Sequence, residues 1–261
     1  EKLTQRDKFE VRRKSAAAQG LLRGLGFACF LETARGAPEE GAEIIFANDG
    51  KIELRLGTES NGQGHETTFS QIASERLGLP IEIFRFVNAD TALTRIGHGH
   101  GGARTMHMGG SALVTALNLV MEKARFIAAQ HLQVHEKKIK FKTGVFIAEG
   151  NPQSISLEEV ARQADGSLNT FALVDDVPFT FPGGCHVAEV EVDPETGKTK
   201  ILNYIAVDDY GTVINVPLTE GQVLGGIAQG IGQAIGEYTA YDLSTGQLIS
   251  GSLTDYFVPR A

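Results

Sequence analysis

The chain has 261 residues, 42% of them hydrophobic, with 24 Lys+Arg against 32 Asp+Glu and a formal net charge of −8. This composition and a mean hydropathy of −0.08 exclude general disorder and collagen-like or low-complexity classes. The acidic balance argues against a nucleic-acid partner, and no apolar stretch reaches the roughly 20 residues of a membrane-spanning helix.

In the first half of the chain, hydrophobic periodicity and turn residues predict alternating strands and helices. The expected elements are a leading helical segment at 1–22, a strand at 25–34, a hairpin of 42–47 with 51–56, a helix that Gly78 ends, a strand at 81–87 and a helix at 113–132. Asn48-Asp49-Gly50 supplies the turn of the hairpin.

The second half repeats this mixture. Residues 137–182 predict a strand, a turn and a short helix, which a capping box at 156–159 begins. A second hairpin of 186–192 with 199–207 leads to a glycine-rich helix at 217–235. We therefore predict an α+β fold in two mixed subdomains with antiparallel hairpins and long helices, at 23–150 and 151–261.

The two cysteines, Cys29 and Cys185, match no C-x-x-C spacing of a zinc or iron–sulfur site. We expect two buried free thiols, although counting alone leaves a structural disulfide open. The chain begins at Glu1 without a Met or an apolar signal segment, so we expect a processed or excised piece of a cytoplasmic protein, with a periplasmic location left open.

Three of the glycine clusters stand where a helix is expected to begin. They are Gly62-Gln63-Gly64, the segment 98–105 and Gly221-Gln222 with Gly225-Gly226. Unpaired backbone N–H groups and the helix dipole favour an anion at such a place, so the clusters together predict a polyanionic ligand that is read by amide groups. Each loop alone has the alternative of a tight turn, and neither a dinucleotide fingerprint nor a P-loop is present.

Histidines and acids offer rival sites. His98, His100 and His107 could ligate zinc in a hydrolase, but we favour histidines that line a ligand site or the surface. Asp208 and Asp209 could be paired acids, and solvated turn residues are the interpretation we prefer.

Four segments carry a family resemblance. They are 57–69, 101–105, 207–215 and 220–230, which read GTESNGQGHETTF, GGART, VDDYGTVIN and EGQVLGGIAQG. In order and spacing they resemble the molybdopterin-binding large subunit of the xanthine dehydrogenase and aldehyde oxidase family, which includes aerobic carbon monoxide dehydrogenase. The resemblance extends over residues 23–258.

The resemblance implies a molybdenum hydroxylase that inserts oxygen from water into an aldehyde, a purine or another N-heterocycle, or that oxidises CO. It implies a molybdopterin cytosine dinucleotide with Mo, 2Fe-2S clusters and FAD on partner subunits or domains, the rest of the large subunit as a further partner, and an oligomeric enzyme. The cofactor-binding residues that it implies are Gly62, Gln63, Gly64, His65, Gly101, Gly102, Ala103, Arg104, Thr105, Asp208, Asp209, Asn215 and Gln222.

The chain also departs from the family pattern. His100 and Ala103 stand in a stretch that is commonly Thr-Gly-Gly-Ser-Arg-Ser, and His98 replaces a smaller residue. The family's N-terminal half would precede Glu1, and its catalytic glutamate would follow beyond Ala261. We therefore expect neither a catalytic nor a metal-ligating residue here, assign no catalytic role to Glu237, and expect no turnover by this segment alone. The alternative is a non-catalytic scaffold that has lost the cofactor site.

Overall fold

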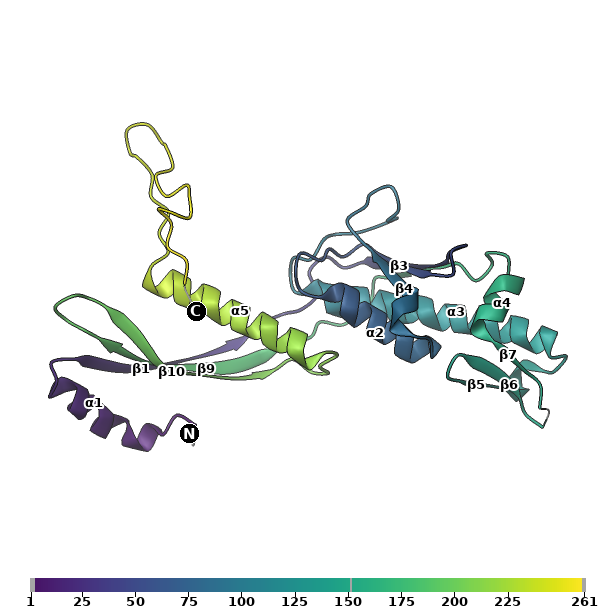
Figure 1. The fold of residues 1–261 in the computed structure, drawn as a ribbon, viewed down its shortest axis with the longest axis horizontal. Helices are drawn as coiled ribbons and strands as arrows, with labels where there is room; N and C mark the ends of the chain where they lie inside the picture. Colours follow the sequence, from purple (N-terminus) through teal and green to yellow (C-terminus); the bar gives the residue numbers. More distant parts are fainter. Residues whose placement is uncertain (1–2, 151, 260–261) are drawn as a thin grey trace. The chain divides into compact units, whose positions relative to one another are not determined.

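The computed structural model describes residues 3–150 and 152–259 and divides the chain into two compact units (Figure 1). Unit 1 combines the residues up to Glu32 with those from Pro182 onward, and unit 2 is Thr33–Phe181. The boundary expected near residue 150 thus falls inside unit 2. The reason is a long-range strand pairing: β1 (Leu22–Leu31) is antiparallel to β9 (Gly183–Val192), so that the chain leaves unit 1 and later returns to it.

Within its described residues, unit 2 contains two sheets and three α-helices. Its four-stranded sheet has the order β4-β3-β2-β8, with β2 (Glu40–Phe46), β3 (Ile52–Leu56), β4 (Phe84–Val87) and β8 (Thr170–Val174). A smaller antiparallel sheet holds β5 (Ile139–Lys142), β6 (Val145–Ala148) and β7 (Ser154–Ser156). The helices are α2 (His65–Leu77), α3 (Gly110–His131) and α4 (Leu157–Gln163), with short turns η2 (Ile81–Ile83), η3 (Thr105–Gly109) and η4 (Glu136–Lys138).

The hydrophobic core lies between the larger sheet and its helices. On α3, Leu113, Leu117 and Val120 are fully buried and face β2 and β8, as the 3.6-residue period of this segment predicts. Burial alternates along strand β3: Ile52 and Leu54 point into the core, while Glu53 and Arg55 are partly exposed. The predicted α+β class, both hairpins and the helix stop at Gly78 are confirmed.

Two local predictions differ from the structure. Residues 81–83 form a 3-10 turn that begins at Pro80, so that β4 starts only at Phe84 and then pairs in parallel with β3. The start of the long helix is also different: η3 is one turn of π-helix that runs directly into α3. Such π turns occur frequently at functional sites.

Unit 1 is a three-stranded antiparallel sheet with two helices. The strand order is β1-β9-β10, with β10 at Thr199–Asp209, and the helices are α1 (Phe9–Ala17) and α5 (Val216–Ile235). A short 3-10 turn, η1 (Arg6–Lys8), precedes α1. Arg12 of α1 pairs with Glu189 of β9 at 2.6 Å, so the basic leading segment is tied to the sheet through this side chain.

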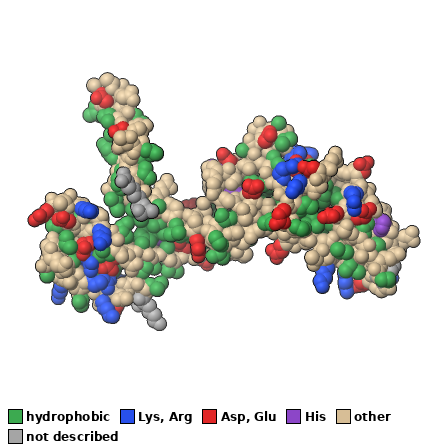
Figure 2. Space-filling model, viewed as in Figure 1, with side chains coloured by type: hydrophobic (Ala, Val, Ile, Leu, Met, Phe, Trp, Pro, Cys, Tyr) green, Lys and Arg blue, Asp and Glu red, His purple; other side chains and the backbone are tan. Residues whose placement is uncertain are grey.

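Hydrophobic side chains of unit 1 remain widely exposed. On α5 only Gly232 is buried, while Val216, Leu224 and Ile235 are exposed. Figure 2 shows apolar side chains at the surface of the part that carries this helix. Among the residues that the structure describes, no helix combines the length and the hydropathy that crossing a bilayer requires.

Both cysteines belong to unit 1. They are free, as expected, but Cys29 is exposed and Cys185 is half-buried, so the expectation of burial was wrong. The physical reason is that both lie on a sheet that no residue of the hydrophobic core cluster covers.

Candidate functional site

Two glycine loops of unit 2 meet through their backbones. The first, 57–64, joins β3 to α2, and the second, 97–104, precedes η3 and α3. A Cβ atom on Gly57 would lie 1.9 Å from the carbonyl oxygen of Ile96, and one on Gly97 would lie 2.3 Å from the carbonyl oxygen of Gly57. No side chain fits at either position, so glycine at both is what allows the two loops to touch.

The first loop ends in the N-cap of α2. Gly64 has a left-handed φ of 78°, and its carbonyl accepts hydrogen bonds from the N–H groups of Thr67 and Thr68 at 3.1 and 3.2 Å. The side-chain oxygen of Gln63 accepts from the N–H of Asn61 at 2.6 Å. Gln63 therefore holds the loop in place through its side-chain oxygen.

The second loop is held by a buried ion pair. Arg104 and Glu40 both have fully buried side chains and bond to each other. Arg104 also donates to the carbonyl oxygen of Gly99 at 3.2 Å and to that of Glu39. Burial raises the pKa of the Glu40 carboxyl, and the N–H of Gly41 together with the Arg104 charge opposes that rise.

Arg104, which the resemblance implies as a cofactor-binding residue, is held in this arrangement away from the surface of the loop. The guanidinium lies under the loop and is engaged by Glu40 and by backbone carbonyls, which leaves it no exposed surface. Its contribution is to position Gly101, Gly102 and Ala103, all of them exposed. Ala103 is held at a φ of 52°, a left-handed conformation that is uncommon for a residue with a Cβ.

Four buried polar atoms on or beside these loops lack a hydrogen-bond partner among the described residues. They are Thr58 Oγ1, His65 Nδ1, Arg104 Nε and Thr105 Oγ1, on residues that are 0%, 9%, 0% and 5% exposed. His65 stacks on Phe69 with ring centroids 5.5 Å apart. Burial, and to a lesser degree His100, lowers the pKa of His65, so its imidazole is neutral at pH 7.

Unpartnered polar atoms are costly to bury, and native proteins rarely leave them so. Their clustering at the starts of α2 and η3, where backbone N–H groups are also unpaired, indicates a polar and anionic ligand. The residues present therefore fit a pterin or pyrophosphate group.

The histidines of the second loop have separate partners. His98 Nε2 lies 3.3 Å from Glu39, His100 Nδ1 lies 3.3 Å from Glu59, and His107 Nε2 lies 2.7 Å from the carbonyl oxygen of Pro178. Within residues 3–150 and 152–259, no group of three His, Cys, Asp or Glu side chains is arranged to hold a metal ion. The zinc-hydrolase alternative thus has no geometric support.

The remaining candidates belong to unit 1. Asp208 accepts from Tyr210 at 2.6 Å and lies 3.1 Å from His186 Nε2. Burial, with Asp208 as the second cause, raises the pKa of Tyr210 to about 12. Asp209 accepts from the N–H of Gly211 at 2.8 Å, as a turn residue does.

Asn215 is the N-cap of α5 and accepts from the N–H of Leu218 at 3.0 Å, while Gln222 is exposed on that helix. The structure thus brings the candidates at 62–65 and 101–105 together in unit 2, and it places Asp208, Asp209, Asn215 and Gln222 in unit 1.

Sequence reasoning missed Glu40, Thr58 and His186. Glu40 lies in a strand and pairs with a residue 64 positions away, so no local sequence pattern indicates this ion pair. Thr58 follows the conspicuous Gly57, and a small polar residue inside a glycine loop was the available signal. His186 lies in a strand whose alternation gives no hint of a hydrogen bond to Tyr204 at 2.9 Å.

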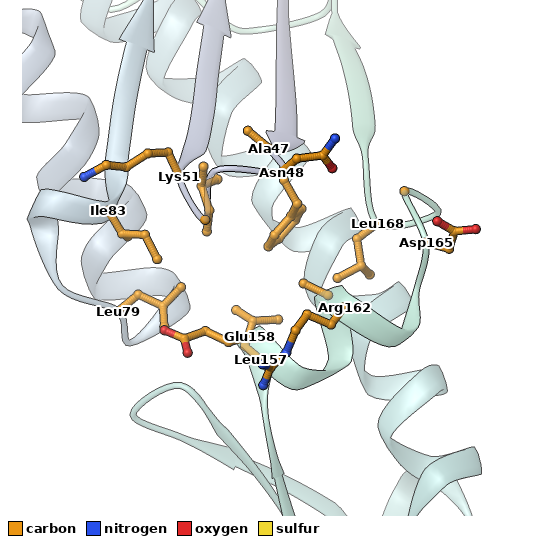
Figure 3. Close-up of a pocket in the computed structure, with 15 residues that line it drawn as sticks. Ala47, Asn48, Lys51, Leu79, Ile83, Leu157, Glu158, Arg162, Asp165 and Leu168 are labelled. Atoms are coloured by element: carbon orange, nitrogen blue, oxygen red, sulfur yellow. The ribbon is translucent and has the colours of Figure 1, made fainter.

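Unit 2 also has a cavity of about 580 Å³, at the turn between β2 and β3 (Figure 3). Leu79, Ile83, Leu157 and Leu168 form apolar walls, and Lys51 extends from the turn. None of the candidate cofactor residues lines it. The cavity is therefore separate from the glycine-loop site.

Glycine loops at the starts of helices, with buried polar atoms that lack protein partners, are typical of a domain that binds a cofactor. The family model described as "Molybdopterin cofactor-binding domain" matches residues 2–261. The chain thus belongs to the molybdopterin cofactor-binding domain family of the molybdenum hydroxylases, as the resemblance indicated.

Individual relatives agree. The chain is 32% identical to the carbon monoxide dehydrogenase large chain of Hydrogenophaga pseudoflava, over 92% of this chain and 32% of the relative. It is 30% identical to the putative xanthine dehydrogenase molybdenum-binding subunit of Escherichia coli, over 96% of this chain and 36% of that subunit. The structure of quinoline 2-oxidoreductase from Pseudomonas putida 86 matches with a TM-score of 0.86 and 30% identity, over 99% of this chain and 36% of the matched chain. The chain spans about a third of these proteins.

Proposed function

We propose that this chain forms part of the cofactor site of a molybdenum hydroxylase and binds the pterin and pyrophosphate of a molybdopterin cytosine dinucleotide. The observation that carries the proposal is the cluster of unpartnered buried atoms on Thr58, His65 and Thr105 beside two loops that meet through glycine backbone. When bound, the cofactor supplies two-electron oxidation of a substrate, with water as the oxygen source.

The residues of the chain have distinct parts in this proposal. Thr58 and Thr105 offer hydroxyl groups, and neutral His65 offers Nδ1 to a polar ligand atom. Gly101 and Gly102 let the ligand approach the backbone, and Arg104 holds their loop in place from below. Gln63 presents its amide at the start of α2. By resemblance, Gln222 and Asn215 serve the same cofactor, with Asp208 and Asp209 toward its nucleotide end.

The substrate class is an aldehyde, a purine or another N-heterocycle, or CO. Electrons pass to 2Fe-2S clusters and FAD on partner domains or subunits, and the rest of the large subunit completes the pocket. The relatives named as large or molybdenum-binding subunits support this assignment. We also propose a cytoplasmic enzyme and no turnover by the 261-residue segment alone.

The test uses the complete protein that contains this chain. Thr105→Val removes one hydroxyl without changing the shape of the side chain. Thr115→Val in the adjoining helix α3 is the control, because Thr115 donates to the carbonyl oxygen of Ser111 within that helix. We expect T105V to lower bound molybdenum, and the CMP released by acid hydrolysis, several-fold while the thermal midpoint of the cofactor-free protein stays unchanged. T115V should retain the molybdenum and the CMP.

Wild-type levels of molybdenum and CMP in T105V would contradict the assigned role of Thr105. If the wild-type protein itself carries neither molybdenum nor pterin, the non-catalytic scaffold is supported instead. Its motivation is the departure at His98, His100 and Ala103 from the family pattern. Release of a nucleotide other than CMP would overturn the cytosine form only.

A further inference from the structure

The two cysteines of unit 1 are directly opposite each other on neighbouring strands. Cys29 of β1 and Cys185 of β9 are paired in an unbroken antiparallel register from Leu22 with Val192 to Leu31 with Gly183. The next pair along, Glu32 with Pro182, is joined by a 2.9 Å hydrogen bond from the Glu32 N–H. Because bonded and non-bonded pairs alternate, Cys29 and Cys185 form a non-hydrogen-bonded pair.

This position suits a covalent link. Cα atoms of a non-hydrogen-bonded pair are about 4.5 Å apart, within the roughly 4.4–6.8 Å that a disulfide spans. Directly paired residues of an antiparallel ladder also point their side chains to the same face of the sheet, so the two thiols face each other. A bond between the sulfur atoms therefore requires no movement of the strands.

The two thiols differ in reactivity. Cys29 is exposed, whereas Cys185 is half-buried. The hydrogen bond with Cys29, followed by burial, raises the pKa of Cys185. The thiolate is the nucleophile in thiol–disulfide exchange, so Cys29 reacts first and Cys185 follows.

We propose that Cys29 and Cys185 form a reversible disulfide between β1 and β9 by exchange with a low-molecular-weight disulfide such as glutathione disulfide. The Cys29 thiolate attacks one sulfur of that disulfide, forms a mixed disulfide and releases one thiolate. Cys185 gives up its proton and attacks the Cys29 sulfur, which expels the second thiolate. Two protein thiols are oxidised by two electrons, and the small disulfide is reduced to two thiols.

The link would tie unit 1 together independently of unit 2. All of Thr33–Phe181 lies within the loop that the bond closes. The proposal does not rest on the cofactor site, because none of the residues assigned to the cofactor takes part in it.

The experiment is peptide mapping of the full chain without reduction, after equilibration with glutathione disulfide and alkylation of the remaining thiols. Trypsin cuts after Arg23 and Arg35, and after Arg162 and Lys198. We expect peptide 24–35 to appear joined to peptide 163–198, and dithiothreitol to restore both separate peptides. C185S should stop at a stable glutathione adduct on Cys29, while C29S should yield no joined peptide.

Three results would overturn the proposal. The first is two glutathione adducts on one molecule, which would mean that the thiols do not reach each other. The second is a disulfide-linked dimer through Cys29. The third is two thiols that remain fully alkylated at every ratio of glutathione to its disulfide. Because the wild-type chain alone decides among these results, misfolding of a variant leaves the test valid.

Discussion

Arg104 and Glu40 show how a buried pair can serve a neighbouring binding loop. A fully buried ion pair is not strongly stabilising compared with apolar residues, because both charges lose their hydration. Removing one partner is costly, since the other charge then remains buried alone. The pair is thus better understood as a device that holds the 97–104 loop against the start of β2 than as a source of stability.

We predict that Arg104→Met lowers the free energy of unfolding by about 3–5 kcal/mol, because it strands the Glu40 carboxylate. Arg162→Met is the control, since Arg162 pairs with Glu159 at the surface and its loss should cost less than about 1 kcal/mol. The double variant E40Q/R104M should lose less than R104M. Urea unfolding followed by circular dichroism measures all three, and equal losses in R104M and R162M would contradict the prediction.

His65 should make stability depend on pH. Burial, followed by His100, lowers its pKa in the folded state below the ordinary value near 6.5. The unfolded chain therefore binds the proton more readily, and the stabilisation present above about pH 6.5 is lost as the pH falls through the folded pKa.

We predict that the free energy of unfolding declines between about pH 7.5 and about pH 5.5, and that His65→Gln declines less over the same interval. The difference in slope is the readout, because the loss of the contact with Phe69 shifts the absolute value at every pH. Equal slopes in the two proteins would refute a titrating role for His65.

For single residues, the sequence indicated which side chains to consider but not what each of them does in the fold. Gly62, Gly64 and Gly102 were predicted as candidates because glycine clusters mark loops before helices. Arg104 was found for the same reason, but its use was not, because the use depends on Glu40 and on carbonyls that only the tertiary fold brings near. A single sequence does not encode such a pairing in any local pattern.

Among the elements, the two glycine loops depend on each other through backbone contact. The Cβ of an alanine at Gly97 would lie 2.3 Å from the carbonyl oxygen of Gly57 and 2.7 Å from its Cα. At Gly101, four residues further along, a Cβ would meet nothing within 4 Å. A substitution at Gly97 therefore tests the contact between the two loops, whereas one at Gly101 tests the space that a ligand could occupy.

We predict that Gly97→Ala lowers the free energy of unfolding by about 1–3 kcal/mol, since one of the loops must shift. Gly101→Ala should leave stability nearly unchanged while it narrows the space beside the loop. Thermal and urea denaturation of both variants provide the measurement. A G97A protein as stable as G101A would mean that the loops do not need to touch.

Hydrophobic period and turn chemistry predicted most elements. The helix expected at 113–132 is observed at Gly110–His131, and Ser156 is confirmed as the N-cap of α4 by the bond from the Glu159 N–H to its hydroxyl. The π turn at Thr105–Gly109 was not predicted, because its extra residue per turn leaves no mark in a hydrophobic pattern. The 3-10 turn at Ile81–Ile83 was missed because its apolar residues also suit a strand.

For the whole molecule, the uneven distribution of buried side chains is the main feature. Every residue of the hydrophobic core cluster belongs to unit 2. Local opening is easiest where few apolar side chains are buried. Unit 1, and α5 above all, should therefore be the less stable part of this chain.

We predict that backbone amides of α3 exchange with deuterium at least about tenfold more slowly than those of α5 in the 261-residue chain. The two helices have similar lengths, at 22 and 20 residues, so helix length does not explain the difference. Hydrogen exchange read by mass spectrometry measures it. Equal protection would show that α5 is covered in solution.

The division into units could not be predicted from the order of the expected strands and helices, which suggested a boundary near residue 150. Local patterns describe strands but not which strands pair, and β1 finds its partner only after all of unit 2 has passed.

This insertion has a consequence for biosynthesis. At about 5–20 residues per second, β1 leaves the ribosome roughly 10–30 s before β9 does. Unit 2 is synthesised during that interval, and its last strand, β8, leaves the ribosome just before β9, when the bridge between Ala34 and Thr180 can bring its two ends together. We expect unit 2 to begin folding before β9 pairs with β1. Until then β1 has no partner strand, and its apolar side chains Phe27 and Leu31 can bind chaperones.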